Sequence, residues 1–97
     1  MFLRHYVIAL FGDLAKTKNK KLEENFDNIV NLLIQDLNIP NKSINDPYAE
    51  DKIHICNNSC WTLGLLSISY PEKIEVFIDQ IMIRLLKIFC VPRVFYY

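Results

Sequence analysis

Three residues that could bind a metal ion lie close together in the middle of the chain. They are His54, Cys56 and Cys60, and a helix would place the two cysteines, four residues apart, on one face. Zinc sites usually combine four such ligands in two closely spaced pairs, and no second pair occurs here. We therefore expect no metal. The total of three cysteines is too few for a disulfide framework and is typical of a reducing compartment.

Residues that could catalyse a reaction are isolated from one another. The sequence identifies no catalytic partner for His5 or His54, and it has no nucleophile elbow. With two glycines in the whole chain, a Gly-rich phosphate loop is also excluded. We predict that the protein is not an enzyme and uses no cofactor.

Charge gives no general reason to expect nucleic acid as a partner. Eleven Lys and Arg residues balance eleven Asp and Glu residues. The lysines at 16, 18, 20 and 21 are compatible with a basic binding patch or localisation signal, but we interpret them as a turn after a helix, where positive charge is favourable. The apolar stretches are interrupted by charged or polar residues, so no membrane span is expected. The N-terminus also lacks the pattern of a signal peptide.

The single tryptophan is the best candidate for a binding residue. On a helix, Trp61, Leu65 and Ile68 lie roughly opposite the face that carries Cys56, Cys60, Leu63 and Ser67. A helical hairpin covers one of these apolar faces, so the other must meet an adjacent repeat, a ligand or a partner chain. Asn58 and Leu65 lie one turn before and one turn after Trp61. Trp61 is therefore either part of a core between repeats or a binding residue, since tryptophan is favoured at binding centres.

The elements that would position these residues are helices. Apolar residues recur at intervals of three and four, as in Leu22, Phe26, Ile29, Leu33 and Leu37, and no strand pattern competes with them. This periodicity predicts helices over residues 2–16, 22–38, 52–69 and 71–89, a polar loop over 39–51 and an atypical tail over 90–97. Asp46 and Pro47 suit the start of a helix. The fold class predicted is all-α, with about four helices in stacked hairpins.

An internal repeat supports stacked hairpins. Residues 6–14 align with residues 58–66 at an offset of 52, which pairs Gly12 with Gly64. A glycine inside a helix is unfavourable by about 1 kcal/mol relative to alanine, so both glycines predict close approach of a neighbouring helix. The alignment also pairs Ala9 with Trp61 and Asp13 with Leu65. Helix-pair repeats of this kind are typical of HEAT and armadillo α-solenoids.

Two sequence motifs carry a resemblance to a known family. They are the strings Ala9-Leu10-Phe11-Gly12-Asp13-Leu14-Ala15-Lys16 and Ile55-Cys56-Asn57-Asn58-Ser59-Cys60-Trp61-Thr62-Leu63-Gly64. Together they resemble the central HEAT repeats of transportin, the karyopherin-β2 class of nuclear import receptors in the importin-β family. Residues 78–88 look like the family's next outer helix, so the resemblance covers residues 7–88.

The resemblance implies a cargo receptor that works in the cytoplasm and the nucleus. Helices 2–16 and 52–69 would be inner helices on a concave surface, and helices 22–38 and 71–89 would be outer helices. In this family the tryptophan of the motif packs against nuclear localisation signals of the proline–tyrosine type, and that role is carried over to Trp61. The predicted cargo-binding residues are Trp61, Asn58, Leu65, Ala9 and Asp13. Ran GTPase and nucleoporins are partners implied for a full-length receptor and not expected to contact this segment.

The sequence also departs from the family pattern. Leu65 stands where the family has an acidic residue, the loop over 39–51 is longer, and residues 89–97 do not continue the repeats. We therefore expect a partial array, as in a gene fragment or truncated product. The alternative function is a structural helical-repeat scaffold fragment with no binding activity of its own.

Overall fold

The protein is entirely helical in the parts that the computed structural model describes, residues 2–38 and 49–89. No strand occurs in these residues, and the all-α prediction is confirmed. The helices are α1 (Phe2–Lys16), α2 (Lys20–Glu24), α3 (Phe26–Gln35), α4 (Ala49–Ser69), α5 (Pro71–Ile74), the 3-10 helix η1 (Glu75–Phe77) and α6 (Ile78–Phe89).

The lysine-rich run forms the turn between α1 and α2. The Lys18 N–H donates to the Ala15 carbonyl and the Asn19 N–H donates to the Leu14 carbonyl, the pair of bonds that defines a Schellman motif. Lys18 has φ of 51°, in the left-handed region. The Asn19 side chain then accepts hydrogen bonds from the backbone N–H groups of Lys21 and Leu22 and caps α2. The turn thus satisfies backbone groups at the end of one helix and at the start of the next.

The predicted helix over residues 22–38 is divided in two. Asn25 separates α2 from α3, its N–H donates to the Leu22 carbonyl, and its side-chain amide donates to the Lys21 carbonyl. The predicted apolar stripe continues through this break, since Leu22, Phe26, Leu33 and Leu37 are all buried. Its remaining member, Ile29, is only half-buried, and the neighbouring Val30 is buried instead. The periodicity therefore predicts most of the buried face and misses the change in backbone path.

The second half of the chain differs from the prediction mainly at its helix ends. Helix α4 begins at Ala49, so residues 49–51 are helical instead of belonging to the polar loop. The predicted helix over 71–89 contains the 3-10 segment Glu75–Phe77. The remainder of the loop, with its proposed Asp46-Pro47 helix start, and the tail 90–97 lie outside the described residues.

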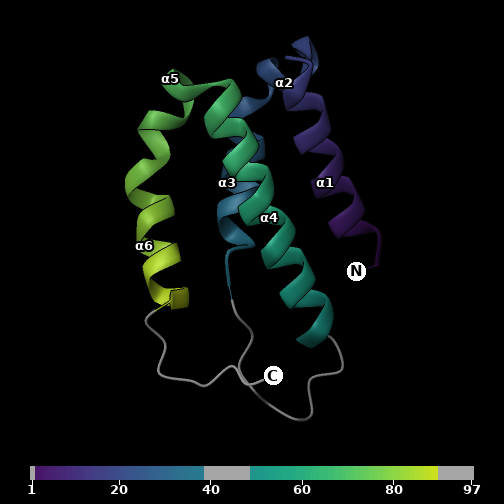
Figure 1. Cartoon of the computed structure of the whole chain (residues 1–97), viewed down its shortest axis with the longest axis vertical. Helices are drawn as coiled ribbons and strands as arrows, with labels where there is room; N and C mark the ends of the chain where they lie inside the picture. The colour runs from purple at the N-terminus through teal and green to yellow at the C-terminus, as the bar shows by residue number, and fades with distance from the viewer. Residues whose placement is uncertain (1, 39–48, 90–97) are drawn as a thin grey trace.

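Helices α1 and α4 pack side by side and run in the same direction (Figure 1). Thr62 Oγ1 donates a 2.9 Å hydrogen bond to the Ile8 carbonyl, and one turn further along both helices Leu65 lies against Gly12. Helices α3 and α6 run in the opposite direction (Figure 1) and also contact each other. Directly before α6, the ring of Phe77 in η1 lies with its centroid 6.4 Å from that of Phe26 in α3.

The two pairs of helices form two layers, α1 with α4 and α3 with α6. Between the layers, Arg4 of α1 makes a bidentate ion pair with Asp36 just after α3, with distances of 2.8 and 3.0 Å. Side chains from α1 through η1 form the buried core, and Ile81, Leu85 and Ile88 of α6 pack against it half-buried. The buried core residues are Ile8, Ala15, Leu22, Phe26, Val30, Leu33, Ile34, Leu37, Ile55, Cys56, Leu63, Leu66, Tyr70, Ile74 and Phe77. Among residues 2–38 and 49–89, no helix combines the length and hydropathy needed to cross a bilayer.

Candidate functional site

Trp61 lies on the flank of α4 where that helix meets α1. Its side chain is 46% exposed, and its ring packs over Gly12. A Cβ at Gly12 would lie 2.7 Å from Cζ3 of Trp61 and 2.9 Å from Cδ1 of Leu65, both too close for a carbon atom. The close approach predicted for Gly12 is therefore confirmed, and the neighbouring helix is α4.

The corresponding prediction for Gly64 is wrong within the part of the chain that the structure describes. A Cβ at Gly64 would meet no other atom within 4 Å. The reason is positional. At 100° per residue, Gly64 is about 160° around α4 from Thr62, which faces α1, so it points away from the helix that α4 packs against.

A charged side chain of α1, Lys16, lies beside the indole ring. The Lys16 ammonium lies 5.3 Å from the centre of the Trp61 ring, within the range of a cation–π interaction. Its nitrogen is also 3.9 Å from a carboxylate oxygen of Asp13. Both charged side chains are more than half exposed, so these interactions hold them only weakly. An aromatic surface, an ammonium and a carboxylate are thus presented together along the α1–α4 contact.

The other predicted site residues are distributed along the same contact. Leu65 is half-buried against Gly12, and Ala9, three residues before Gly12, is also half-buried. Asp13 is exposed next to Gly12 in the chain and joins the group through Lys16. Asn58 is half-buried one turn before Trp61. Trp61, Leu65 and Asp13 are thus linked through contacts with Gly12 or Lys16.

Sequence reasoning missed Lys16 as part of this group. The basic run predicts a turn that includes Lys16, yet this residue is four positions after Gly12 and therefore lies on the same side of α1. Once Gly12 is placed under Trp61, this spacing alone brings the lysine beside the ring.

The cysteine pair is a separate feature on the opposite side of α4. Its thiols are hydrogen-bonded to each other, which lowers the pKa of Cys60 to about 7 against the opposing effect of burial. The same hydrogen bond, with burial, raises the pKa of the Cys56 thiol. Cys60 therefore forms a thiolate more readily than Cys56. His54 is paired with Glu50 at 3.9 Å, and the described residues contain no group of three or more metal ligands.

This arrangement is suited to contact with another chain through Trp61. The half of the indole that Gly12 does not cover offers apolar surface, and the adjacent lysine and aspartate offer charge of both signs. No protein-family model matches the sequence, and neither does a curated protein or a solved structure.

Proposed function

We propose that this chain is a segment of a nuclear import receptor, an α-solenoid of the transportin type that binds nuclear localisation signals of cargo proteins. In this proposal α1 and α4 are inner helices of consecutive HEAT repeats and line the concave surface. The other layer, α3 and α6, is the outer one. The protein is not an enzyme, and it acts in the cytoplasm and the nucleus.

The observation that carries the proposal is the half-exposed position of Trp61. The sequence motif around it resembles the transportin motif, in which the tryptophan contacts the signal peptide. A tryptophan whose ring is held on one side by Gly12 and open on the other is rigid and still accessible. Rigid aromatic anchors of this kind account for much of the binding energy at protein interfaces.

The arrangement of the helices is a second support. Equivalent helices of consecutive repeats in a solenoid pack side by side in the same direction, and α1 with α4 and α3 with α6 both do so (Figure 1). The repeat of residues 6–14 at residues 58–66 falls on α1 and α4, the two helices that the proposal makes equivalent.

The test is binding of a fluorescently labelled proline–tyrosine signal peptide, measured by anisotropy. One short segment offers few anchors, so we expect weak binding by the wild-type chain and saturation only at high protein concentration. Trp61→Ala should weaken it by about 1–3 kcal/mol, the usual range for an interface anchor, or roughly 5- to 150-fold. Because Trp61 is the only tryptophan, its fluorescence gives a direct second readout in the wild type.

Two controls make the result specific. A peptide with alanines in place of the proline and tyrosine should not bind. Ile83→Ala removes a side chain of α6 that is 56% exposed, similar to Trp61, and should leave the affinity unchanged. Peptide affinity unaffected by Trp61→Ala would contradict the proposal.

The alternative, a scaffold fragment without binding activity, is favoured by the contact between Trp61 and Gly12. If Trp61 serves only packing, Trp61→Ala should lower the free energy of unfolding by close to the value that is typical for a core tryptophan, about 3–5 kcal/mol. If Trp61 serves mainly as a binding anchor, its half-exposed ring predicts a smaller loss of folding stability, about 1–2 kcal/mol. Urea denaturation of the same variant therefore separates the two functions.

A further inference from the structure

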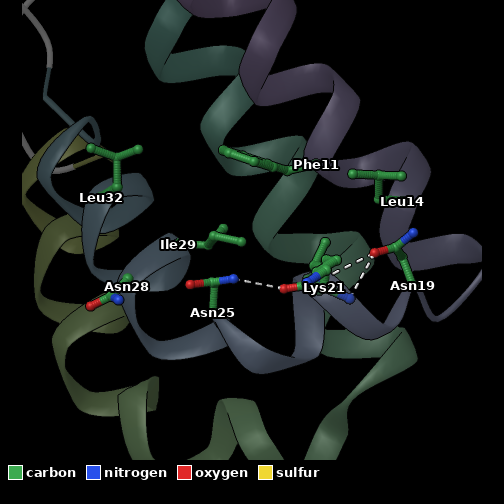
Figure 2. Close-up of a pocket in the computed structure, with 9 residues that line it drawn as sticks. Phe11, Leu14, Asn19, Lys21, Asn25, Asn28, Ile29 and Leu32 are labelled. Atoms are coloured by element: carbon green, nitrogen blue, oxygen red, sulfur yellow. Dashed lines mark hydrogen bonds between the residues drawn. The ribbon is translucent and has the colours of Figure 1, made fainter.

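The first helical hairpin, α1 with α3, and the second, α4 with α6, present different open faces. The first, the α1/α3 open face, contains Val7, Leu10, Phe11, Leu14, Ile29 and Leu32. The second, the α4/α6 open face, contains Cys60, Gly64, Ser67, Ile78, Met82 and Leu86. Between α1 and the α2/α3 region, the α1/α3 open face has a groove of about 410 Å³ (Figure 2). Phe11, Leu14, Ile29 and Leu32 are among its lining residues.

Helix geometry places both faces away from the internal contact. Leu10 and Leu14 are each about 160° around α1 from Gly12, the residue that α4 covers. Met82 and Leu86 are likewise about 160° around α6 from Arg84, whose guanidinium donates to the Asn38 side chain next to α3. Leu10, Met82 and Leu86, all about half exposed, therefore point away from these contacts.

The internal repeat relates each open face to one side of the α1–α4 interface. Adding 52 to Val7, Leu10 and Leu14 gives Ser59, Thr62 and Leu66, which are fully buried where α4 meets the first hairpin. In α1, by contrast, Leu10 is 51% exposed. The α1/α3 open face thus has apolar residues at the positions that α4 uses to contact a preceding hairpin.

The same offset describes the other face. Adding 52 to Ile8, Gly12 and Ala15, which are buried, gives Cys60, Gly64 and Ser67, none of which is buried. Gly12 is covered by Trp61 and Leu65, whereas a Cβ at Gly64 would meet nothing within 4 Å. The α4/α6 open face therefore repeats the small-residue surface on which α4 packs, with Gly64 uncovered and Cys60 and Ser67 half-buried.

We propose that a second copy of this chain covers these faces, stacking in the same direction so that α1 of one copy packs on α4 of the next. Val7, Leu10 and Leu14 of one copy would lie over Cys60, Gly64 and Ser67 of the next. This contact would repeat the one within a single copy, where Ser59, Thr62 and Leu66 of α4 pack on the first hairpin. In the second layer, Ile29 and Leu32 would meet Met82 and Leu86. Because the two faces differ, the contact is heterologous and leaves one open face at each end, so further copies can add.

The test is a mixing experiment in sedimentation velocity. Leu10→Glu puts a charge on the α1/α3 open face, and Gly64→Glu puts one on the α4/α6 open face. Wild-type protein should form dimers and larger species that grow with concentration. Each variant alone should be monomeric, with association weakened at least tenfold. An equimolar mixture of the two should form a dimer and nothing larger, because each variant keeps the face that the other has lost.

Control variants separate this result from loss of folding. Both substituted positions are exposed, and helix content by circular dichroism should be unchanged; if Leu10→Glu loses helix, Val7→Glu replaces it on the same face. Val76→Glu, in η1 and outside both faces, should associate like the wild type although Val76 is 75% exposed. A monomeric wild type at all concentrations would overturn the proposal. So would a mixture that gives no dimer, since association would then use another surface.

Discussion

The contact between Trp61 and Gly12 combines packing with access to solvent. A side chain at residue 12 would hold the indole away from α1, so the absence of a Cβ lets α1 and α4 approach each other. The part of the ring that remains exposed is bordered by Lys16, which is close enough for a cation–π interaction. The same residue thus stabilises the α1–α4 contact and offers a surface to a partner.

The two glycines should respond in opposite ways to alanine. Gly12→Ala gains helix propensity of about 1 kcal/mol, but the new methyl group overlaps Trp61 and Leu65, and overpacking typically costs about 1–3 kcal/mol. We expect a net loss of stability and a red shift of Trp61 fluorescence as the ring moves toward water. Gly64→Ala meets open space and should raise the free energy of unfolding by about 0.5–1 kcal/mol.

Urea denaturation followed by circular dichroism measures both changes. It is done in dilute solution because Gly64 belongs to the α4/α6 open face. The pair forms its own control, since both substitutions are identical and both glycines are helical with negative φ. Equal stabilisation by the two alanines would show that Trp61 does not pack on Gly12.

Only part of the candidate site could be predicted from the sequence. The separation of Trp61 from the Cys56 face followed from 100° per residue, and the structure has Cys56 buried and Trp61 half-exposed. Periodicity shows which residues share a helix face, but it does not show which other helix packs on that face. The internal repeat predicts a neighbouring helix at both Gly12 and Gly64, although the described residues place one only at Gly12.

At the scale of elements, the turn between α1 and α2 sets the direction of the first hairpin. It reverses the chain with two backbone hydrogen bonds, a left-handed Lys18 and the Asn19 cap, whose two accepted bonds are drawn in Figure 2. A lysine in the left-handed region is strained by about 1–2 kcal/mol, because its Cβ approaches the following carbonyl oxygen. Asn19, by contrast, is a favoured residue at its position.

Two substitutions in this turn should therefore change stability in opposite directions. Lys18→Gly removes the Cβ and should raise the free energy of unfolding by up to about 1 kcal/mol. The gain is limited because glycine also has more conformational freedom in the unfolded chain. Asn19→Ala removes the acceptor for the Lys21 and Leu22 N–H groups and should cost about 0.5–2 kcal/mol. Thermal denaturation by circular dichroism measures both. Lys21→Gly is a useful comparison, because glycine inside α2 should destabilise the helix.

Helices were easier to predict than their interruptions, and the reason is visible at Asn25. The buried residues Leu22 and Phe26 keep helical spacing across the break, so the hydrophobic pattern contains no sign of it. The break depends on hydrogen bonds of the Asn25 amide and N–H, which a local pattern does not specify. The 3-10 segment at residues 75–77 is hidden in the same way, since Ile74 and Phe77 are buried at a spacing that an α-helix also allows.

For the whole molecule, the two open faces determine how stability depends on concentration. Stacking as proposed buries Leu10 and covers Gly64 only when both copies are folded, so association favours the folded state by mass action. The melting temperature of the wild type should therefore rise by a few degrees when the protein concentration rises from about 10 μM to about 1 mM.

The Leu10→Glu variant is the matched comparison for this effect. A charge on the α1/α3 open face opposes stacking while leaving α1 and its contact with α4 intact, because Leu10 is on the far side of α1 from Gly12. Its melting temperature should be independent of concentration and equal that of the wild type at high dilution. Differential scanning calorimetry over the concentration range measures both proteins. The same rise in both would place the self-association on another surface, and no rise in either would mean that the open faces do not bind each other.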